Sequence, residues 1–344
     1  NTVFQYEKTF PLEFTREQVE DVQKTSIALQ DLVPLIAGEY KFQLLLKNTV
    51  SKEFTSFESA VSVPQDLRTL QITQLLLGYR LKKDFSSPDV NRPFKIGIDQ
   101  IACQAENTFQ AKENLIVFFQ IYGLSKEVHK SGILKITFFK EGKEFSTVRK
   151  NLGRLDSKNI LEEFSLESFP AGHYEIQVSI LDRSSREILS RKEEFEVSPL
   201  SSLPRPWIFS RSMPASHHIE YSFILGNQFA NTGNFQEAKR LIEEAYDRNP
   251  SSPKYALSYG QLLVKMKEYR RAKEILLPFS ENPEENYQFL SLLGYSCQSL
   301  GQYEEAILFY KKYLSQAETN LRILNSVGEC YYRLGNIKEA LAAW

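Results

Sequence analysis

Two kinds of hydrophobic pattern divide this chain near residue 200. Before that point, short apolar or alternating runs recur between turn residues, which is typical of β-strands. The predicted strands are Tyr40–Leu46, Ile96–Ile101, Leu115–Tyr122, Leu134–Phe139, Tyr174–Leu181 and Phe195–Val197. After that point, large apolar residues recur at helical spacing. The pattern predicts a multidomain protein of the α and β class, with β-rich modules first and an all-helical region last.

The helical region, residues 217–344, repeats itself every 34 residues. Two sets of small residues keep this interval: Gly226, Gly260, Gly294 and Gly328, and Ala238, Ala272, Ala306 and Ala340. We expect small residues where two helices touch, because close backbone approach excludes larger side chains. A third set consists of Gly233, Gly301 and Gly335, with Lys267 at the equivalent position of the second unit. It predicts turns in which glycine ends a helix at positive φ.

This pattern resembles the tetratricopeptide repeat family, whose unit has the same length. The matching motif is Leu-Gly at 225–226 and 293–294, then Gly-x-Phe/Tyr at 233–235 and 301–303, with an alanine three positions later. The resemblance implies a helix–turn–helix solenoid. Its units are expected at 219–252, 253–286, 287–320 and 321–344. Because the last unit stops at Trp344 without a polar cap, we expect more protein to follow in the natural chain.

The β region contains a second, longer internal repeat. The segment Ala37–Gln43 resembles Ala171–Gln177, which lies 134 residues later in the chain. The Gly-x-Tyr start, the strand, the polar turn and the returning strand resemble the last hairpin of an immunoglobulin-like β-sandwich, in which the tyrosine hydroxyl often anchors a corner. We therefore expect a partial immunoglobulin-like domain at 1–64, with its N-terminal strands missing, and a complete one at 65–198.

Three segments depart from the strand pattern. Thr15–Lys24 predicts a helix, because Thr15 and Gln18 have the spacing of a capping box. Residues 80–95 are polar and predict a surface loop. Residues 199–216 are rich in proline and serine and predict a linker without a regular element. Three consecutive residues of this linker are too apolar for a free tether, so we expect them to pack against a neighbouring domain: Trp207, Ile208 and Phe209.

Tandem sandwiches followed by such repeats are similar to large exported bacterial proteins that carry a GWxTD domain. The stretch from Val63-Pro64 to Leu77-Gly78 resembles a connector in those proteins, although the motif itself is absent. The resemblance favours an exported, periplasmic or cell-envelope location over the cytoplasm. Since the chain begins at Asn1 without a methionine, we interpret it as a fragment.

Composition adds few constraints. The net charge of −1 gives no overall field that favours nucleic acid or an anionic membrane. No apolar run approaches the ~20 residues that cross a bilayer. The three cysteines, Cys103, Cys297 and Cys330, are far apart and form no disulfide framework. Cys297 and Cys330 fall at nearly the same phase of the repeat and are predicted to be small core residues, with redox sensing as the alternative.

Catalytic motifs are missing from the sequence. It contains no glycine-rich phosphate loop and no HExxH, CxxC or GxSxG motif. We therefore predict no enzymatic activity, no cofactor and no metal site, and expect no small-molecule ligand. His217 and His218 open the first repeat helix and point about 100° apart, so they are predicted to be polar helix-entry residues rather than metal ligands.

The repeat resemblance implies a binding surface on the inner face of the solenoid, formed by recurring positions of each first helix. Amides there can pair with a peptide backbone, tyrosines can stack and cations can hold acidic groups. The alternative is an ordinary hydrated surface. The predicted residues are Glu220, Phe223, Asn227, Ala230, Asn231, Lys254, Leu257, Gln261, Val264, Lys265, Gln288, Ser291, Tyr295, Gln298, Ser299, Arg322, Asn325, Glu329, Tyr332 and Arg333.

One subset of the family grips a C-terminal carboxylate with a clamp of lysine, asparagine and arginine. Only Asn227 matches that clamp, and the other clamp positions hold Phe223, Ser258, Gln288 and Leu292. We therefore predict no binding to such tails.

The leading hypothesis is a scaffold protein whose solenoid binds a protein or an extended peptide and whose sandwiches act as spacers. The alternative is the accessory region of a larger exported enzyme, with Tyr122 or Trp207 as a platform for glycans.

Overall fold

The computed structural model describes residues 2–22, 24–87, 89–155, 158–281, 286–316 and 320–344. It divides into two compact units. The β unit comprises Thr9–Val33 and Ala37–Met213. The helical unit comprises Asn1–Lys8, Pro34–Ile36 and Pro214–Trp344. Two short segments of the N-terminal part of the chain therefore pack with the helices.

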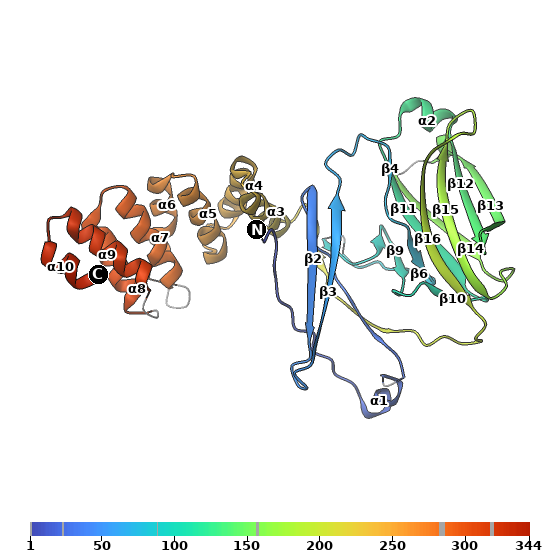
Figure 1. Cartoon of the computed structure of the whole chain (residues 1–344), viewed down its shortest axis with the longest axis horizontal. Helices are drawn as coiled ribbons and strands as arrows, with labels where there is room; N and C mark the ends of the chain where they lie inside the picture. The colour runs from blue at the N-terminus through green and yellow to red at the C-terminus, as the bar shows by residue number, and fades with distance from the viewer. Residues whose placement is uncertain (1, 23, 88, 156–157, 282–285, 317–319) are drawn as a thin grey trace. The chain divides into compact units, whose positions relative to one another are not determined.

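Two sheets of the β unit share one hydrophobic core (Figure 1). Their strand orders are β10-β16-β15-β12-β13 and β14-β11-β4, and β5 also pairs with β11. Phe119 of β11, Phe138 of β12 and Val178 of β15 are each at most 1% exposed and belong to the same cluster. The strands are β4 (Gln71–Ile72), β5 (Leu76–Gly78), β10 (Thr108–Gln110), β11 (Asn114–Tyr122), β12 (Ile133–Lys140), β13 (Lys143–Asn151), β14 (Asn159–Ser165), β15 (Gly172–Leu181) and β16 (Glu187–Ser198).

The predicted strands agree with these elements and with β2 (Gly38–Lys47), apart from one that is split. Residues 96–101 divide into β8 (Lys95–Ile96) and β9 (Asp99–Ala102), because Gly97 takes a left-handed turn at φ +61. A short helix, α2 (Lys126–Ser131), lies where only polar sequence was evident. Ser125 caps α2 through a bond from the Val128 N–H to the serine hydroxyl.

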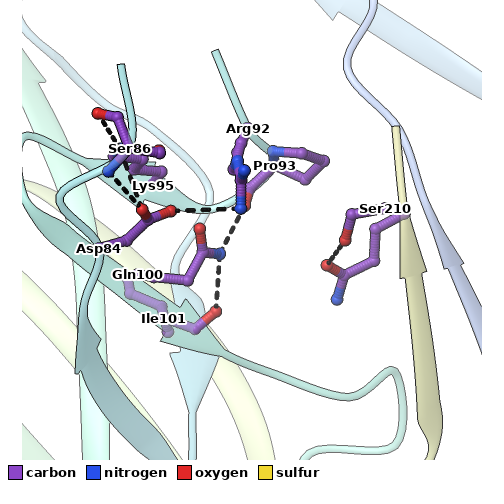
Figure 2. A network of polar contacts seen from close by, with 9 residues as sticks. Asp84, Ser86, Arg92, Pro93, Lys95, Gln100, Ile101 and Ser210 are labelled. Atoms are coloured by element: carbon purple, nitrogen blue, oxygen red, sulfur yellow. Dashed lines mark hydrogen bonds and ion pairs between the residues drawn. The ribbon is translucent and has the colours of Figure 1, made fainter. Parts of the chain in front are cut away.

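Residues 80–95 were predicted to be a polar loop, and this prediction is wrong. They contain β6 (Arg80–Lys83), β7 (Val90–Asn91) and β8, and β6 and β8 both pair with β9. Figure 2 shows the polar contacts behind this order. The Asp84 carboxylate accepts the Ser86 N–H at 2.8 Å and lies 3.5 Å from the Lys95 ammonium. Lys95 also donates to the Ser86 hydroxyl at 2.7 Å. These bonds let polar residues form an ordered structure.

The N-terminal part of the β unit contains a helix and a separate hairpin. Helix α1 (Arg16–Val22) has the predicted capping box: the Thr15 N–H donates to the Gln18 side chain at 2.9 Å, and the Gln18 N–H donates to the Thr15 hydroxyl at 3.4 Å. Strands β2 (Gly38–Lys47) and β3 (Phe54–Val63) form a two-stranded sheet.

The linker prediction is wrong in one respect, because part of residues 199–216 forms strands. Strand β17 (Trp207–Ser210) pairs in parallel with β1 (Ile27–Gln30), and β18 (Met213–Pro214) follows. The Trp207 ring meets the Phe14 ring edge-on at 5.9 Å. Trp207 and Phe209 therefore pack on Phe14 of the β unit, as their apolar character suggested, whereas Ile208 is 38% exposed.

Arg205 fixes the preceding part of this linker to the β unit. It pairs with the Glu113 carboxylate, donates to the Gln104 side chain at 2.7 Å and lies 4.0 Å from the centre of the Tyr79 ring. Charged, amide and aromatic partners thus hold one arginine against the β unit.

The helical unit is a row of antiparallel helix pairs (Figure 1). Its helices are α3 (Ile219–Thr232), α4 (Phe235–Arg248), α5 (Pro253–Lys265), α6 (Tyr269–Leu276), α7 (Asn286–Ser299), α8 (Tyr303–Leu314), α9 (Leu321–Arg333) and α10 (Ile337–Ala343). The predicted turn glycines all have φ between +77 and +87, and Lys267 adopts φ +63 at the equivalent place. The turn is therefore kept in the second unit at the cost of backbone strain.

The recurring glycines lie at helix–helix contacts, as predicted. A Cβ atom added at Gly260 would lie 2.4 Å from Leu276, and one at Gly294 would lie 2.4 Å from the Tyr310 ring. The recurring alanines from Ala238 to Ala340 are all 0% exposed. The period of the sequence thus reflects one close contact that is repeated in each helix pair.

Candidate functional site

The first helices of the first three units lie beside one another, and a bond from Gln298 to Glu329 joins the third to the fourth. Helix α3 contacts α5, and α5 contacts α7, while each second helix packs between consecutive first helices. Side chains at equivalent positions of the first helices therefore come together along one wall of the unit. The predicted inner-face residues lie on these helices, and we describe them from the first unit to the fourth.

The first two units are joined by a buried aromatic contact and by an ion pair at its exposed edge. Lys254 pairs with Glu220, and its ammonium lies 4.9 Å from the centre of the Phe223 ring. The Tyr255 hydroxyl donates to the other Glu220 oxygen at 3.0 Å. Burial and then the bond to Glu220 raise the pKa of Tyr255 to about 12. These contacts stabilise the stacking of α5 on α3.

Phe223 was predicted to be open on the inner face, but the structure buries it. Its side chain is only 5% exposed and packs on the Tyr255 ring at a centroid distance of 4.7 Å. The ring fills space between two first helices, where a ligand cannot reach most of its surface. Asn227, next along the same face, donates to the Phe223 carbonyl at 2.9 Å.

A second contact joins the third and fourth units. The buried Tyr310 hydroxyl donates to the Gln298 side chain at 2.8 Å, and Gln298 donates to Glu329 at 3.0 Å. Glu329 also lies 3.7 Å from Arg333. Both Gln298 and Glu329 were predicted as ligand contacts, and here their polar groups already bind one another across α7 and α9.

The open part of the predicted face is aromatic and basic. Tyr295 is 45% exposed, and its ring contacts the Tyr269 ring. Tyr332 is 56% exposed, and its ring contacts the Trp344 ring. Other exposed predicted residues are Lys254, Gln261, Lys265, Gln288, Ser299, Arg322, Asn325 and Arg333. Leu257, Ser291, Ala230 and Val264 are half-buried. Lys265 and Arg322 form no ion pair within the described residues, so their charges remain available.

The chain itself covers part of this face in the first unit. Asn231, a predicted ligand contact, donates from its side-chain amide to the Val3 carbonyl at 3.1 Å. The N-terminal residues belong to the helical unit. The free portion of the face is therefore displaced toward α5, α7 and α9. No sequence pattern pointed to this contact, because its two partners lie 228 residues apart in the sequence.

Cys297, Cys330 and His218 have structural roles. Cys297 and Cys330 are both 0% exposed, as expected for core residues, and burial raises the pKa of each thiol to about 11. Such thiols form little of the reactive thiolate near neutral pH. His218 caps α3 by accepting the Glu220 N–H at 3.2 Å. Within the described residues, no group of three or more histidine, cysteine or acidic side chains could hold a metal ion.

Neither aromatic residue suggested as a glycan platform is a free ring. The Tyr122 hydroxyl donates to Gln120 at 2.9 Å, and Lys158 lies 5.0 Å from the centre of its ring. Trp207 packs against Phe14 within the β unit. Among the helices that the structure describes, none is long and apolar enough to cross a membrane.

Comparison with known proteins identifies the helical repeats. Family models described as tetratricopeptide repeat match residues 232–290 and residues 287–320. The C-terminal region thus contains tetratricopeptide repeats. No curated protein matches the chain.

Solved structures similar to this chain include several of MamA. MamA MSR-1 is 24% identical, with 37% of this chain and 74% of that chain covered and a TM-score of 0.36. MamA AMB-1 is also 24% identical, with the same coverage and a TM-score of 0.35. MamA from Desulfovibrio magneticus RS-1 is 21% identical, with coverage of 37% and 71% and a TM-score of 0.35.

Proposed function

We propose that this chain, whose C-terminal helices are tetratricopeptide repeats, is a non-enzymatic scaffold that binds an extended peptide segment of a protein partner along the inner wall of its helical unit. Tetratricopeptide repeats are in general protein-interaction modules, and solenoids present extended surfaces of this kind. The binding works through many weak contacts and involves no covalent step.

The observation behind this proposal is the set of exposed aromatic and basic side chains on successive first helices. Tyr295 and Tyr332 offer partly exposed rings, and Lys265 and Arg322 offer charges without an ion-pair partner among the described residues. Aromatic and arginine side chains are the residue types that most often dominate binding energy. The excess of cations favours a peptide that contains Asp or Glu.

The β-rich region serves, in this proposal, as a pair of immunoglobulin-like spacers. The two internal copies share a hairpin register: Gly38 pairs with Val63, and Gly172 pairs with Val197. In the second copy, the Tyr174 hydroxyl donates to the Pro170 carbonyl at 2.6 Å, a short distance upstream in the chain. A bond of this kind is a feature of immunoglobulin-like domains.

The first copy is proposed to be an incomplete domain. Ile176, Val178 and Ile180 of β15 are all 0% exposed under the facing sheet. Their equivalents in β2 remain open, at 43%, 39% and 40% exposure: Phe42, Leu44 and Leu46. An isolated hairpin is marginally stable at best. We propose that strands from outside residues 1–64 cover this apolar face.

The inner-wall proposal can be tested with paired variants of the whole chain. Peptides are selected on the wild type from a random library displayed on phage, and their affinities are compared with those for Tyr295→Ala/Arg322→Ala. We expect this variant to bind at least about tenfold more weakly, since two central contacts cost about 1 kcal/mol or more each.

The control changes exposed residues on second helices, Arg270→Ala and Leu308→Ala, and should leave affinity unchanged. Helicity, followed by circular dichroism, should be the same in all three proteins. Equal affinity for the inner-wall variant and the wild type would reject the proposal.

A further inference from the structure

A polar residue is fully buried at the N-terminal end of the solenoid. Gln228 on α3 is 0% exposed, and the equivalent residues of the later units are Leu262, Ser296 and Cys330, each at most 1% exposed. In those later units, the preceding second helix covers this side: α4 packs on α5, α6 on α7, and α8 on α9. Helix α3 is the first helix of the row, so something else must cover Gln228.

The cover is an extended piece of the chain from far away in sequence. The Gln228 side-chain oxygen accepts the Ile36 N–H at 3.1 Å, and its amide nitrogen donates to the Pro34 carbonyl at 2.7 Å. In extended backbone, the carbonyl of one residue and the N–H of the second residue after it point to the same side. The glutamine amide thus pairs with this segment as a neighbouring β-strand would.

Side-chain burial complements these two bonds. Ile36 is only 9% exposed, and Pro34 is also buried. Pro34–Ile36 belongs to the helical unit, although the residues on both sides of it belong to the β unit. Asn231, one turn further along α3, binds the Val3 carbonyl in addition. Two separate backbone segments are therefore held by amide side chains of the same helix.

We propose that this end of the solenoid is a second peptide-binding site, distinct from the inner wall, which takes a short extended apolar segment and is filled by Pro34–Ile36 of the same chain. The segment replaces the missing preceding repeat and caps the solenoid. Solenoid ends require such a cap, because an uncovered first helix exposes its packing face. The Gln228 amide can bond to the free N–H and C=O groups of extended backbone, as it does here. The equivalent Leu262 is apolar and packs against a helix, whose backbone groups are already bonded.

Hydrogen exchange of the whole chain, resolved to single amides, tests this site. In the wild type, the Ile36 amide should exchange slowly, together with the amides of α3. Gln228→Leu keeps the side-chain bulk and removes both bonds. We expect the Ile36 and α3 amides to exchange about tenfold to a hundredfold faster, while α7 and α8 keep their protection.

Gln261→Leu is the matched control, because Gln261 is exposed on α5, and it should change neither rate. If Gln228→Leu fails to fold, Ile36→Pro removes the donor from the segment instead and should expose α3 in the same way. Rapid exchange of Ile36 in the wild type would overturn the proposal. Unchanged α3 protection in the folded variant would overturn it as well.

Discussion

Replacement of Gly294 by alanine tests whether the period of the helical region arises from helix contact. Gly294 lies on α7, and a Cβ atom there would be 2.4 Å from Cε1 and 2.5 Å from Cδ1 of Tyr310. The Tyr310 ring is only 1% exposed, and its hydroxyl is bonded to Gln298. The ring therefore has little freedom to move away, and α7 or α8 must shift.

The expected magnitude follows from two opposing effects. Overpacking of a buried site costs about 1–3 kcal/mol. Alanine gains about 1 kcal/mol over glycine in a helix interior. We expect Gly294→Ala to lower the free energy of unfolding by about 1 kcal/mol, and by up to about 2 kcal/mol, as the difference of these effects. Urea denaturation followed by circular dichroism at the helical band measures this change.

Gly328→Ala provides a matched control, because it has the same phase in the fourth unit. Its added Cβ would lie 2.4 Å from the Trp344 ring, but Trp344 is 60% exposed at the end of the described chain and can move aside. The control should therefore keep the helix-propensity gain without the cost of overpacking. The two variants should differ by about 1–3 kcal/mol. Equal changes in both would refute the contact explanation of the period.

Three further predictions concern single residues. Lys267→Gly should raise the free energy of unfolding by up to about 1 kcal/mol in urea titrations, because it relieves a left-handed backbone at φ +63; a loss would contradict the strain. Ser296→Ala should raise the thermal midpoint, since the buried Ser296 hydroxyl has no partner among the described residues; a lower midpoint would show that it has one. Hydrogen bonds from Ser190 and then Ser179 lower the pKa of Glu187 from 4.5, so their stabilisation is present above that pH and is lost as the pH falls through the folded value. Glu187→Gln should therefore flatten the acid side of a stability–pH curve, and an unchanged slope would argue against these bonds.

Features set by local sequence could be predicted well. The helix pairs follow from the recurring Gly294-type contacts and the turn glycines, which act within a single repeat unit. The capping box at Thr15 and Gln18 also depends only on close neighbours in the sequence. Strand positions such as β11 and β15 followed from apolar runs that a two-sided core requires.

Features set by long-range pairing could not be predicted. The parallel pairing of β1 with β17 joins segments from the two ends of the β unit, and a proline-rich sequence gave no sign of it. The order around Asp84 depends on a charge network whose members are each typical of a surface loop. The residues predicted for the inner wall lie on α3, α5, α7 and α9, the first helices of the units. The helical phase alone had a limit. It could not show that Asn231 is taken by Val3 or that Phe223 is buried, because both depend on tertiary packing.

The most direct test of the account is a hydrogen-exchange footprint of the tightest selected phage peptide on the whole chain. If the peptide lies along the inner wall, the backbone amides of α5, α7 and α9 should gain the most protection, around Lys265, Tyr295 and Arg322. The second helices α6 and α8 and the β unit should keep their exchange rates. A footprint confined to α6, α8 or the β unit would contradict binding at the inner wall.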